Sequence, residues 1–425
     1  MSVKLGNEAG QSSRSVTNAW LRELADRVPV LASLLEVPSE QQIARGYGHT
    51  LREICQQPLT WLETSEIAVE RRELLERAVY GSPDGQRAGA LALTGSGSSL
   101  SAADCLVLPL QRSLQVPVVS LSGGQLLTDG KRVLPPIEPR LLVSFARSGN
   151  SPESCGVVDL LLEEDPACRH LVITCNRNGK LAASYTGNPR IATLTLADRT
   201  CDRSLMMTSS FTNMVLAGLS LAYLGAPAEY RRVVDALASS ARSLLLSNTG
   251  CLTELARGSF ASAVYLASGA NIGAARESAL KLLESTGGRV RAFAETYLGL
   301  RHGPMAAVHR DTLLVCFLSS DRLVRAYEQD VIEELNSKEL GLAKVIVGDD
   351  IPEQLLNPQD LAVRCPGMAA AGDDAAPSLH VLVGQLIAFF QCMQQGLRPD
   401  SPSVDGVISR VVESFRIHRP VGERK

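Results

Sequence analysis

One pattern of residues occurs twice in this chain, at a constant shift of 172 positions. The shift places Leu141-Leu142-Val143-x-Phe145-x-x-Ser148 on Leu313-Leu314-Val315-x-Phe317-x-x-Ser320, Ser96-Gly97 on Ser268-Gly269, and Ala102-Ala103 on Ala274-Ala275. A single offset that serves several separate segments predicts two copies of one domain in tandem. We expect these copies at residues 86–230 and 235–410, each beginning with a strand, a glycine-rich turn and a helix.

The 425 residues leave room for further segments on both sides of the two copies. Residues 1–14 are rich in serine and glycine and are expected to fray. From residue 15 to about residue 80, apolar side chains recur at three- and four-residue steps, which is typical of amphipathic helices. We therefore predict a flexible N-terminus and helical arm over residues 1–85, and a C-terminal tail over 411–425.

Within the first copy, short apolar runs alternate with helical patterns. The predicted strands lie at 88–94, 116–120, 140–146, 170–174 and 191–196, and the predicted helices at 100–114, 152–164, 181–185 and 208–223. Alternation of this kind favours parallel strands joined by crossover helices on both faces. The fold class we expect is α/β, with two tandem three-layer α/β/α domains that contain parallel sheets.

Composition and charge exclude several classes of function. The formal net charge is −3 and no polybasic block occurs, so neither nucleic acid nor an anionic membrane is an expected partner. The N-terminus lacks the apolar run of a signal peptide, and no uninterrupted apolar stretch is long enough to span a bilayer. The ten cysteines form no CxxC pair and the six histidines show no ligand spacing. We expect a cytoplasmic protein with reduced thiols, no metal site and no cofactor.

Three loops of the first copy, each just before a predicted helix, combine hydroxyls with backbone N–H groups. Such loops at the carboxyl ends of parallel strands can hold a phosphate dianion. The candidate phosphate-binding residues are Gly97, Ser98, Ser99, Arg147, Ser148, Asn150, Ser151, Thr208 and Ser209. The alternative is that these serines and glycines only cap helices. None of the loops carries a nucleotide-binding motif, so nucleotides are disfavoured.

The second copy carries a different set of candidates. Glu277, Lys281 and Glu284 recur at i, i+4 and i+7, so they project from one face of a helix. Glu277 and Lys281 alone are best interpreted as an ion pair that stabilises this helix. Glu284 together with His302, which a Gly-Pro turn follows, could carry out aldose–ketose chemistry with a carboxylate proton carrier and a ring-opening imidazole. The Ser319-Ser320-Asp321 loop of this copy would place an acid against any phosphate.

These loops together resemble those of the sugar isomerase (SIS) domain family. The matching segments are TGSGSS at 94–99, SFARSGNSPES at 144–154, DRSLMMTSSF at 202–211 and RHGP at 301–304. They are most similar to the branch of galactosamine-6-phosphate deaminases, also called tagatose-6-phosphate ketose/aldose isomerases. LREICQQP at 51–58 is similar to the segment that leads into the isomerase half of glucosamine-6-phosphate synthase. The likeness spans about residues 51–410.

The resemblance implies roles for the matching positions: phosphate binding for Ser98, Ser99, Ser148 and Ser151, general base for Glu284, ring opening for His302, and polar support from Glu277 and Lys281. The chain also departs from the synthase. Ala146 replaces a serine, two extra residues separate the base from the histidine, and Ser2 stands where a synthase has its cysteine nucleophile. The synthase's C-terminal lysine has no clear match, and Arg410 is the residue that could fill similar space.

The resemblance implies an enzyme that converts a hexosamine 6-phosphate, galactosamine 6-phosphate in first place, into tagatose 6-phosphate and ammonia. It further implies a homodimer or dimer of dimers, in which the His302 loop reaches a neighbouring subunit's site. Two alternatives stay open for an enzyme: simple aldose–ketose isomerisation, and deglycation of a fructosamine phosphate. A third alternative is a non-catalytic sugar-phosphate sensor, which would need the serine loops but neither Glu284 nor His302.

Overall fold

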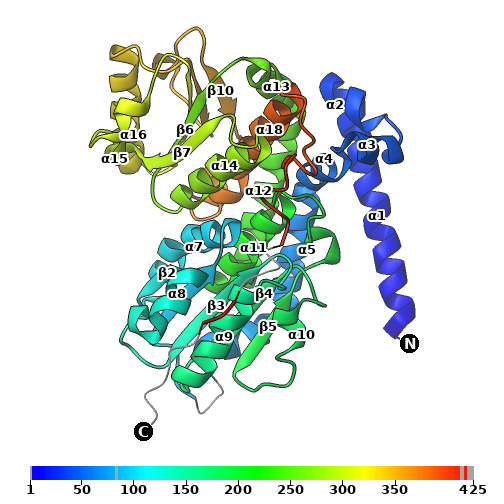
Figure 1. Ribbon diagram of the computed structural model, residues 1–425, viewed down its shortest axis with the longest axis vertical. Coiled ribbons are helices and arrows are strands. Elements are labelled where there is room, and N and C mark those ends of the chain that lie inside the picture. The colour runs from blue at the N-terminus through cyan, green and yellow to red at the C-terminus, as the bar shows by residue number, and fades with distance from the viewer. Residues whose placement is uncertain (1, 82–84, 412–415, 419–425) are drawn as a thin grey trace.

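The structure is a computed structural model that describes residues 2–81, 85–411 and 416–418. Figure 1 shows a helical arm beside two stacked α/β domains, with the first sheet in the lower half and the second sheet in the upper half. The arm consists of α1 (Ser2–Arg27), α2 (Pro29–Leu35), α3 (Ser39–Arg45), α4 (Gly48–Cys55), α5 (Gln57–Glu70) and α6 (Arg72–Tyr80). Helix α1 thus begins at Ser2, where the sequence predicts a frayed start.

The first domain is built on a parallel five-stranded sheet in the order β2-β1-β3-β4-β5. Its strands are β1 (Ala90–Gly95), β2 (Val118–Ser122), β3 (Arg140–Ala146), β4 (Arg169–Thr174) and β5 (Ile191–Thr195). Its helices are α7 (Ser98–Leu114), α8 (Gly123–Asp129), α9 (Pro152–Glu164), α10 (Lys180–Ala183) and α11 (Ser209–Leu219). β1 and β3 are wholly buried, as expected for central strands covered on both faces.

The second domain repeats this plan. Its sheet order is β10-β9-β8-β6-β7, which is the order of the first sheet read from the other edge. Its strands are β6 (Ser262–Ala267), β7 (Arg291–Thr296), β8 (Thr312–Phe317), β9 (Ala343–Gly348) and β10 (Leu361–Arg364). The shift that relates the two sequence copies carries the first residue of β1 onto that of β6, and the first residue of β3 onto that of β8. The duplication predicted from the sequence is therefore confirmed.

The remaining helices cover the second sheet and join the two domains. They are α12 (Pro227–Ser247), α13 (Thr249–Arg257), α14 (Asn271–Ser285), α15 (Tyr297–Leu300), α16 (Arg322–Ser337), α17 (Met368–Ala371) and α18 (Ala376–Gln394). Short 3-10 helices lie at Gly130–Val133, Asp198–Thr200, Ser220–Tyr223, Pro304–Ala307 and Glu353–Leu355. The predicted boundary at 230–235 falls inside α12, so the chain passes between the domains along a helix.

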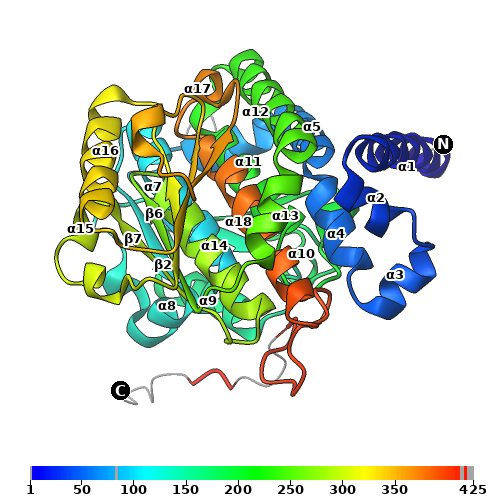
Figure 2. The same ribbon diagram turned by 90° about the horizontal axis from the view of Figure 1, so that it is seen from above.

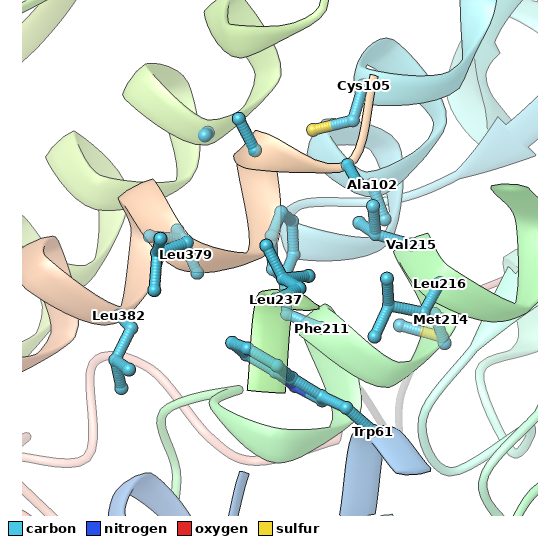
Figure 3. Close-up of a cluster of buried hydrophobic side chains, with 14 of the residues drawn as sticks. Trp61, Ala102, Cys105, Phe211, Met214, Val215, Leu216, Leu237, Leu379 and Leu382 are labelled. Carbon is cyan, nitrogen blue, oxygen red and sulfur yellow. The ribbon is translucent and has the colours of Figure 1, made fainter. Parts of the chain in front are cut away.

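The largest hydrophobic core lies where helices of the arm and of both domains meet. Figure 3 shows Trp61 of α5 near Phe211 of α11 and Leu237 of α12, with Leu379 and Leu382 of α18 beside them. Trp61 is fully buried, and its Nε1 donates to Thr212 Oγ1 at 2.9 Å. Helix α18 is long and apolar enough to cross a membrane, but 94% of that apolar window is buried inside the protein. Its composition therefore reflects its place in this core.

Candidate active site

A cavity of about 150 Å³ lies at the carboxyl ends of β1 and β3. These strands are neighbours whose crossovers leave in opposite directions, which is where open α/β sheets bind ligands. Residues that line the cavity come from four separate segments: Ser96, Ser99, Arg147, Ser148, Gly149, Ser151, Met207 and Arg410 are among them. The cavity thus brings together the two serine loops of the first copy, as the sequence predicts.

The loop after β1 leads into the first turn of α7, next to the cavity. Gly97 has φ 57° and ψ −127°, and a Cβ atom placed there would meet nothing within 4 Å. The backbone therefore requires glycine, while the space above the glycine stays open. Gly97 is the N-cap of α7, where Ser99 N and Leu100 N donate to Ser96 O and Gly97 O. The positive end of the helix dipole still favours an anion at this position.

The loop after β3 has hydroxyls with spare hydrogen-bonding capacity. Ser148 Oγ accepts only a long bond of 3.3 Å from Asn150 N, and Asn150 Oδ1 accepts from Lys180 N at 3.0 Å, which anchors the loop to α10. Ser151 is the N-cap of α9, yet its side chain makes no capping bond. The geometry therefore does not support the alternative that these serines serve only as caps.

The third loop, at residues 202–210, has its hydroxyls turned into the protein. Asp202 Oδ2 accepts from Thr208 N at 2.7 Å and from Ser210 N at 2.9 Å, and the Thr208 hydroxyl donates to Asp202 Oδ1. The Ser209 hydroxyl donates to Glu53 O at 2.7 Å. Thr208 and Ser209 are fully buried and do not line the cavity. Their hydroxyls therefore hold the loop in place from inside the protein.

A carboxyl group from the arm, Glu53, holds the start of the same loop. It accepts from Arg203 N at 2.5 Å and from Ser204 Oγ at 2.5 Å. Burial, together with the nearby Asp202 carboxyl, raises the pKa of Glu53 to about 8. The sequence analysis gave Glu53 no role. It lies in the 51–58 segment that carries part of the resemblance, and that resemblance was the one sequence feature that could have pointed to it.

Arg147 is almost fully buried and connects three parts of the chain. Its Nη1 donates to the carbonyls of Ser204 and Leu205 at 3.1 and 2.9 Å, and its Nη2 donates to Arg410 O at 2.6 Å. Arg410 in turn donates from Nε to Asp202 O at 3.0 Å and lines the cavity. Arg410 therefore lies at the cavity, while its match to the synthase's lysine and a direct contact between Arg147 and phosphate both stay predictions.

The acid–base candidates of α14 form one buried cluster. Lys281 is 1% exposed, and its Nζ lies 3.3 Å from Glu277 Oε1, 2.5 Å from Glu284 Oε2 and 3.0 Å from Ser98 Oγ. The lysine of the second domain thus contacts the phosphate-loop serine of the first, next to the cavity that Ser99 lines. Glu284 remains 22% exposed, so it is the member of this cluster that is open to solvent. Glu277 is fully buried and its contact with Lys281 lacks hydrogen-bond geometry.

Charge interactions in this cluster are strong because it is buried. Burial raises the pKa of Glu277 to about 7 even though Lys281 acts to lower it. Burial would lower the pKa of Lys281, but the two neighbouring carboxylates outweigh it and the pKa lies above its ordinary value. Lys281 therefore stays protonated between the two carboxylates, with its Nζ 2.5 Å from Glu284 Oε2. The interpretation of Glu277 and Lys281 as an ordinary surface ion pair is wrong, since both side chains are buried.

His302 lies apart from this cluster. It follows α15 at the outer edge of the second domain, beside α16, whereas α14 lies against α7 (Figures 1 and 2). The residue is exposed, and its imidazole makes no hydrogen bond with any residue in 2–81, 85–411 or 416–418. Of the three apolar residues before it, Tyr297 and Leu300 are buried within their own domain. Leu298 alone of these is exposed.

No family model matches the chain. A candidate D-galactosamine-6-phosphate deaminase of Streptomyces coelicolor is 38% identical over 376 residues, which cover 87% of this chain and 95% of that protein. The D-galactosamine-6-phosphate deaminase of Escherichia coli O157:H7 is 33% identical, over 77% of this chain and 84% of its own length. The crystal structure of tagatose-6-phosphate ketose/aldose isomerase from Escherichia coli superposes with a TM-score of 0.79 at 30% identity, over 88% of this chain and 97% of that one.

The chain belongs to the sugar isomerase (SIS) domain family. Both of its domains are SIS domains, since the neighbouring structure matches across both five-stranded sheets. Within the described parts of this SIS protein, no group of three or more His, Cys, Asp or Glu side chains could hold a metal ion.

Proposed function

We propose that this SIS protein converts D-galactosamine 6-phosphate and water into tagatose 6-phosphate and ammonia. The single observation that carries the proposal is the meeting of the two domains: serine loops with free hydroxyls from the first domain lie beside the Glu277–Lys281–Glu284 cluster of the second. The names of its relatives support the same chemistry. Ammonia release, measured over a panel of hexosamine 6-phosphates, tests the proposal, and no release from any of them would refute it.

In the proposed mechanism, residues 96–99 and 148–151 hold the phosphate dianion with hydroxyls and helix N-termini. Once the sugar ring is open, Glu284 removes the proton from C2 and returns it to C1. Together with transfer of one proton from the amine nitrogen to the C1 oxygen, this converts the amino aldose into a ketimine at C2, which water hydrolyses to the ketose and ammonia. Lys281 orients Glu284 through their ion pair, and the buried Glu277 fixes Lys281.

A simple isomerase would use the same groups without loss of ammonia, and a fructosamine-phosphate deglycase would release an amine from a ketose. Of these three, only the deaminase releases ammonia from a hexosamine 6-phosphate. Conversion of tagatose 6-phosphate to an aldose would identify the isomerase, and amine release from a fructosamine phosphate would identify the deglycase. A sensor without catalysis is disfavoured, because burying Glu277 and Lys281 costs stability that phosphate binding does not require.

We expect the double variant Ser148→Ala/Ser151→Ala to weaken substrate binding. Each lost hydrogen bond to a charged group is worth about 1.5–3 kcal/mol, so KM should rise at least about tenfold. The matched control is Ser33→Ala, because the Ser33 hydroxyl bonds only to Val30 O on the exposed face of the arm. An unchanged KM in the double variant would show that the two hydroxyls do not bind phosphate.

Because His302 is exposed and distant from α14 in its own chain, we propose that it completes the site of a neighbouring subunit in a homodimer or dimer of dimers. Closed two-fold symmetry would create two such shared sites. Mixing inactive Glu284→Gln and His302→Ala proteins should then restore part of the activity, since one site in each heterodimer has both groups intact. If mass spectrometry shows exchange and no activity returns, the site is not shared.

A further inference from the structure

Two helices, α7 and α14, cross at the domain interface in opposite directions. Near the start of α7, Ser98 contacts Lys281 near the end of α14. In the middle, Arg276 pairs with Asp104 at 2.7 Å. Close contact of the helices requires Gly273, because a Cβ there would lie 2.6 Å from Ser101 O. Each helix therefore extends from the candidate active site to a second place, where the end of α7 meets the start of α14.

A cavity of about 740 Å³ occupies this second place. Its lining combines the end of α7 with the loops that follow β6 and β8, the two central strands of the second sheet. This is the position in the second domain that the candidate active site takes in the first. The lining includes Gln111, Arg112, Ser268, Gly269, Asp321 and Asp374. The cavity is therefore the counterpart, in the second copy of the domain, of the candidate active site in the first copy.

The catalytic groups have no counterparts in this duplicate. The shift that relates the two copies places Arg112 on Glu284, Pro109 on Lys281 and Cys105 on Glu277. Neither a carboxylate proton carrier nor its lysine partner is present at the matching positions. The second cavity can therefore bind a ligand but cannot carry out the same proton transfer.

The place of the phosphate is filled by a side chain of the protein. Ser320 matches Ser148 in the duplication, and it donates to Asp373 Oδ1 from both its N–H, at 2.7 Å, and its hydroxyl, at 2.6 Å. The Ser319 hydroxyl donates to the other Asp373 oxygen. This carboxylate uses the donors that an anion would need. The sequence predicted Asp321 as the acid at this position; Asp321 lines the cavity, but the carboxylate bound to the loop serines is that of Asp373.

The charge of the lining also disfavours an anion. Three carboxylates, from Asp321, Asp373 and Asp374, face a single cation, and Arg112 neutralises only Asp374 through an ion pair of 2.6 Å. Glu328 is fully buried behind the loop, with Oε2 accepting from Ser319 N and Oε1 unpartnered among the described residues. The surplus of carboxylates favours a protonated amine, and the hydroxyl and amide groups suit a polyol.

We infer that this cavity, lined by Arg112, Ser268, Asp321, Asp373 and Asp374, is a second, non-catalytic site for an amino sugar without phosphate. That the ligand is a sugar rests on the proposed function, because the two sites are copies of one another. That the site excludes phosphate is independent of the proposed function, because it follows from the Asp373 contacts and the charge of the lining alone.

Isothermal titration of the full chain with galactosamine tests the inference, with tagatose 6-phosphate present at saturation to occupy the active site. One galactosamine per chain should bind under these conditions. Asp374→Asn should weaken this binding at least about tenfold, and Val324→Trp, which fills the cavity, should abolish it. Leu323→Trp is the matched control, because that neighbouring side chain is 68% exposed and does not line the cavity.

Three results would overturn the inference. They are no binding of galactosamine, binding only when tagatose 6-phosphate is absent, and binding to Val324→Trp that is as tight as binding to the wild type. Ammonia release from hexosamine 6-phosphates by each variant shows that it is folded, and circular dichroism gives the same check if no release occurs. Galactosamine binding that depends on Asp374, without ammonia release from any hexosamine 6-phosphate, would support the second site and refute only the proposed function.

Discussion

Replacing Glu284 by glutamine should lower kcat by about two orders of magnitude or more while substrate binding changes little. The substitution keeps the shape of the side chain but removes the group that carries a proton between C2 and C1, and general acid–base catalysis contributes about 10²–10⁴-fold. The phosphate loops come from the other domain and are not altered. Single-turnover kinetics together with a direct titration of tagatose 6-phosphate would separate the two effects.

Glu333→Gln provides a matched control for this change, because Glu333 is an exposed carboxylate on α16 that lines none of the cavities described. It should keep wild-type kcat and KM. Near-normal turnover of Glu284→Gln would remove Glu284 from the mechanism. Loss of binding along with turnover would instead mean that the carboxylate holds the sugar.

Replacing Lys281 by methionine should strongly destabilise the fold. Methionine fills similar space, but it leaves Glu277 fully buried without its cation and Glu284 without its partner. Breaking a buried ion pair by removing one member costs about 3–5 kcal/mol. The urea midpoint of unfolding measures this loss. Lys338→Met is the control, because its pair with Glu334 lies at the surface and should matter by less than about 1 kcal/mol.

The effect of Lys281→Met should also depend on pH. In the wild type the pKa of Glu277 is about 7, above its ordinary value of 4.5, so the folded state holds this proton more tightly than the unfolded state. Stability therefore falls as pH rises through the window between these values. Without the lysine the pKa of Glu277 should rise further, so the destabilisation should be largest above pH 7 and smallest near pH 5. An equal loss at pH 5 and pH 8 would contradict the buried-pair explanation.

The sheets were predictable because local and periodic signals agree there. α9 occupies the predicted range 152–164, with Pro152 at its first position, where the missing N–H costs nothing. β2 begins at Val118 rather than at residue 116, because Pro117 has no N–H to donate to the sheet. The internal repeat identified the second domain, in which individual strands are harder to recognise.

The site was predictable only in part, because residue type does not reveal which way a side chain faces. Thr208 and Ser209 look like the serines at 148 and 151 in sequence, yet they bond to Asp202 and to Glu53, a residue of the distant helical arm. Ser98 and Lys281 were predicted separately, and their contact across the domain interface became visible only in three dimensions. Sequence spacing cannot supply such partnerships.

The opposed crossing of α7 and α14 has a consequence for the ancestry of the chain. Neither domain holds a complete candidate site, since the serine loops of one work with a helix from the other. A single-domain ancestor could have built such sites only as a symmetric pair, with two equal sites per pair. In one continuous chain each copy can change alone, and here one site has its catalysts while the other has Asp373 in its anion position. Cutting the chain between its two domains should therefore yield two halves that are each inactive.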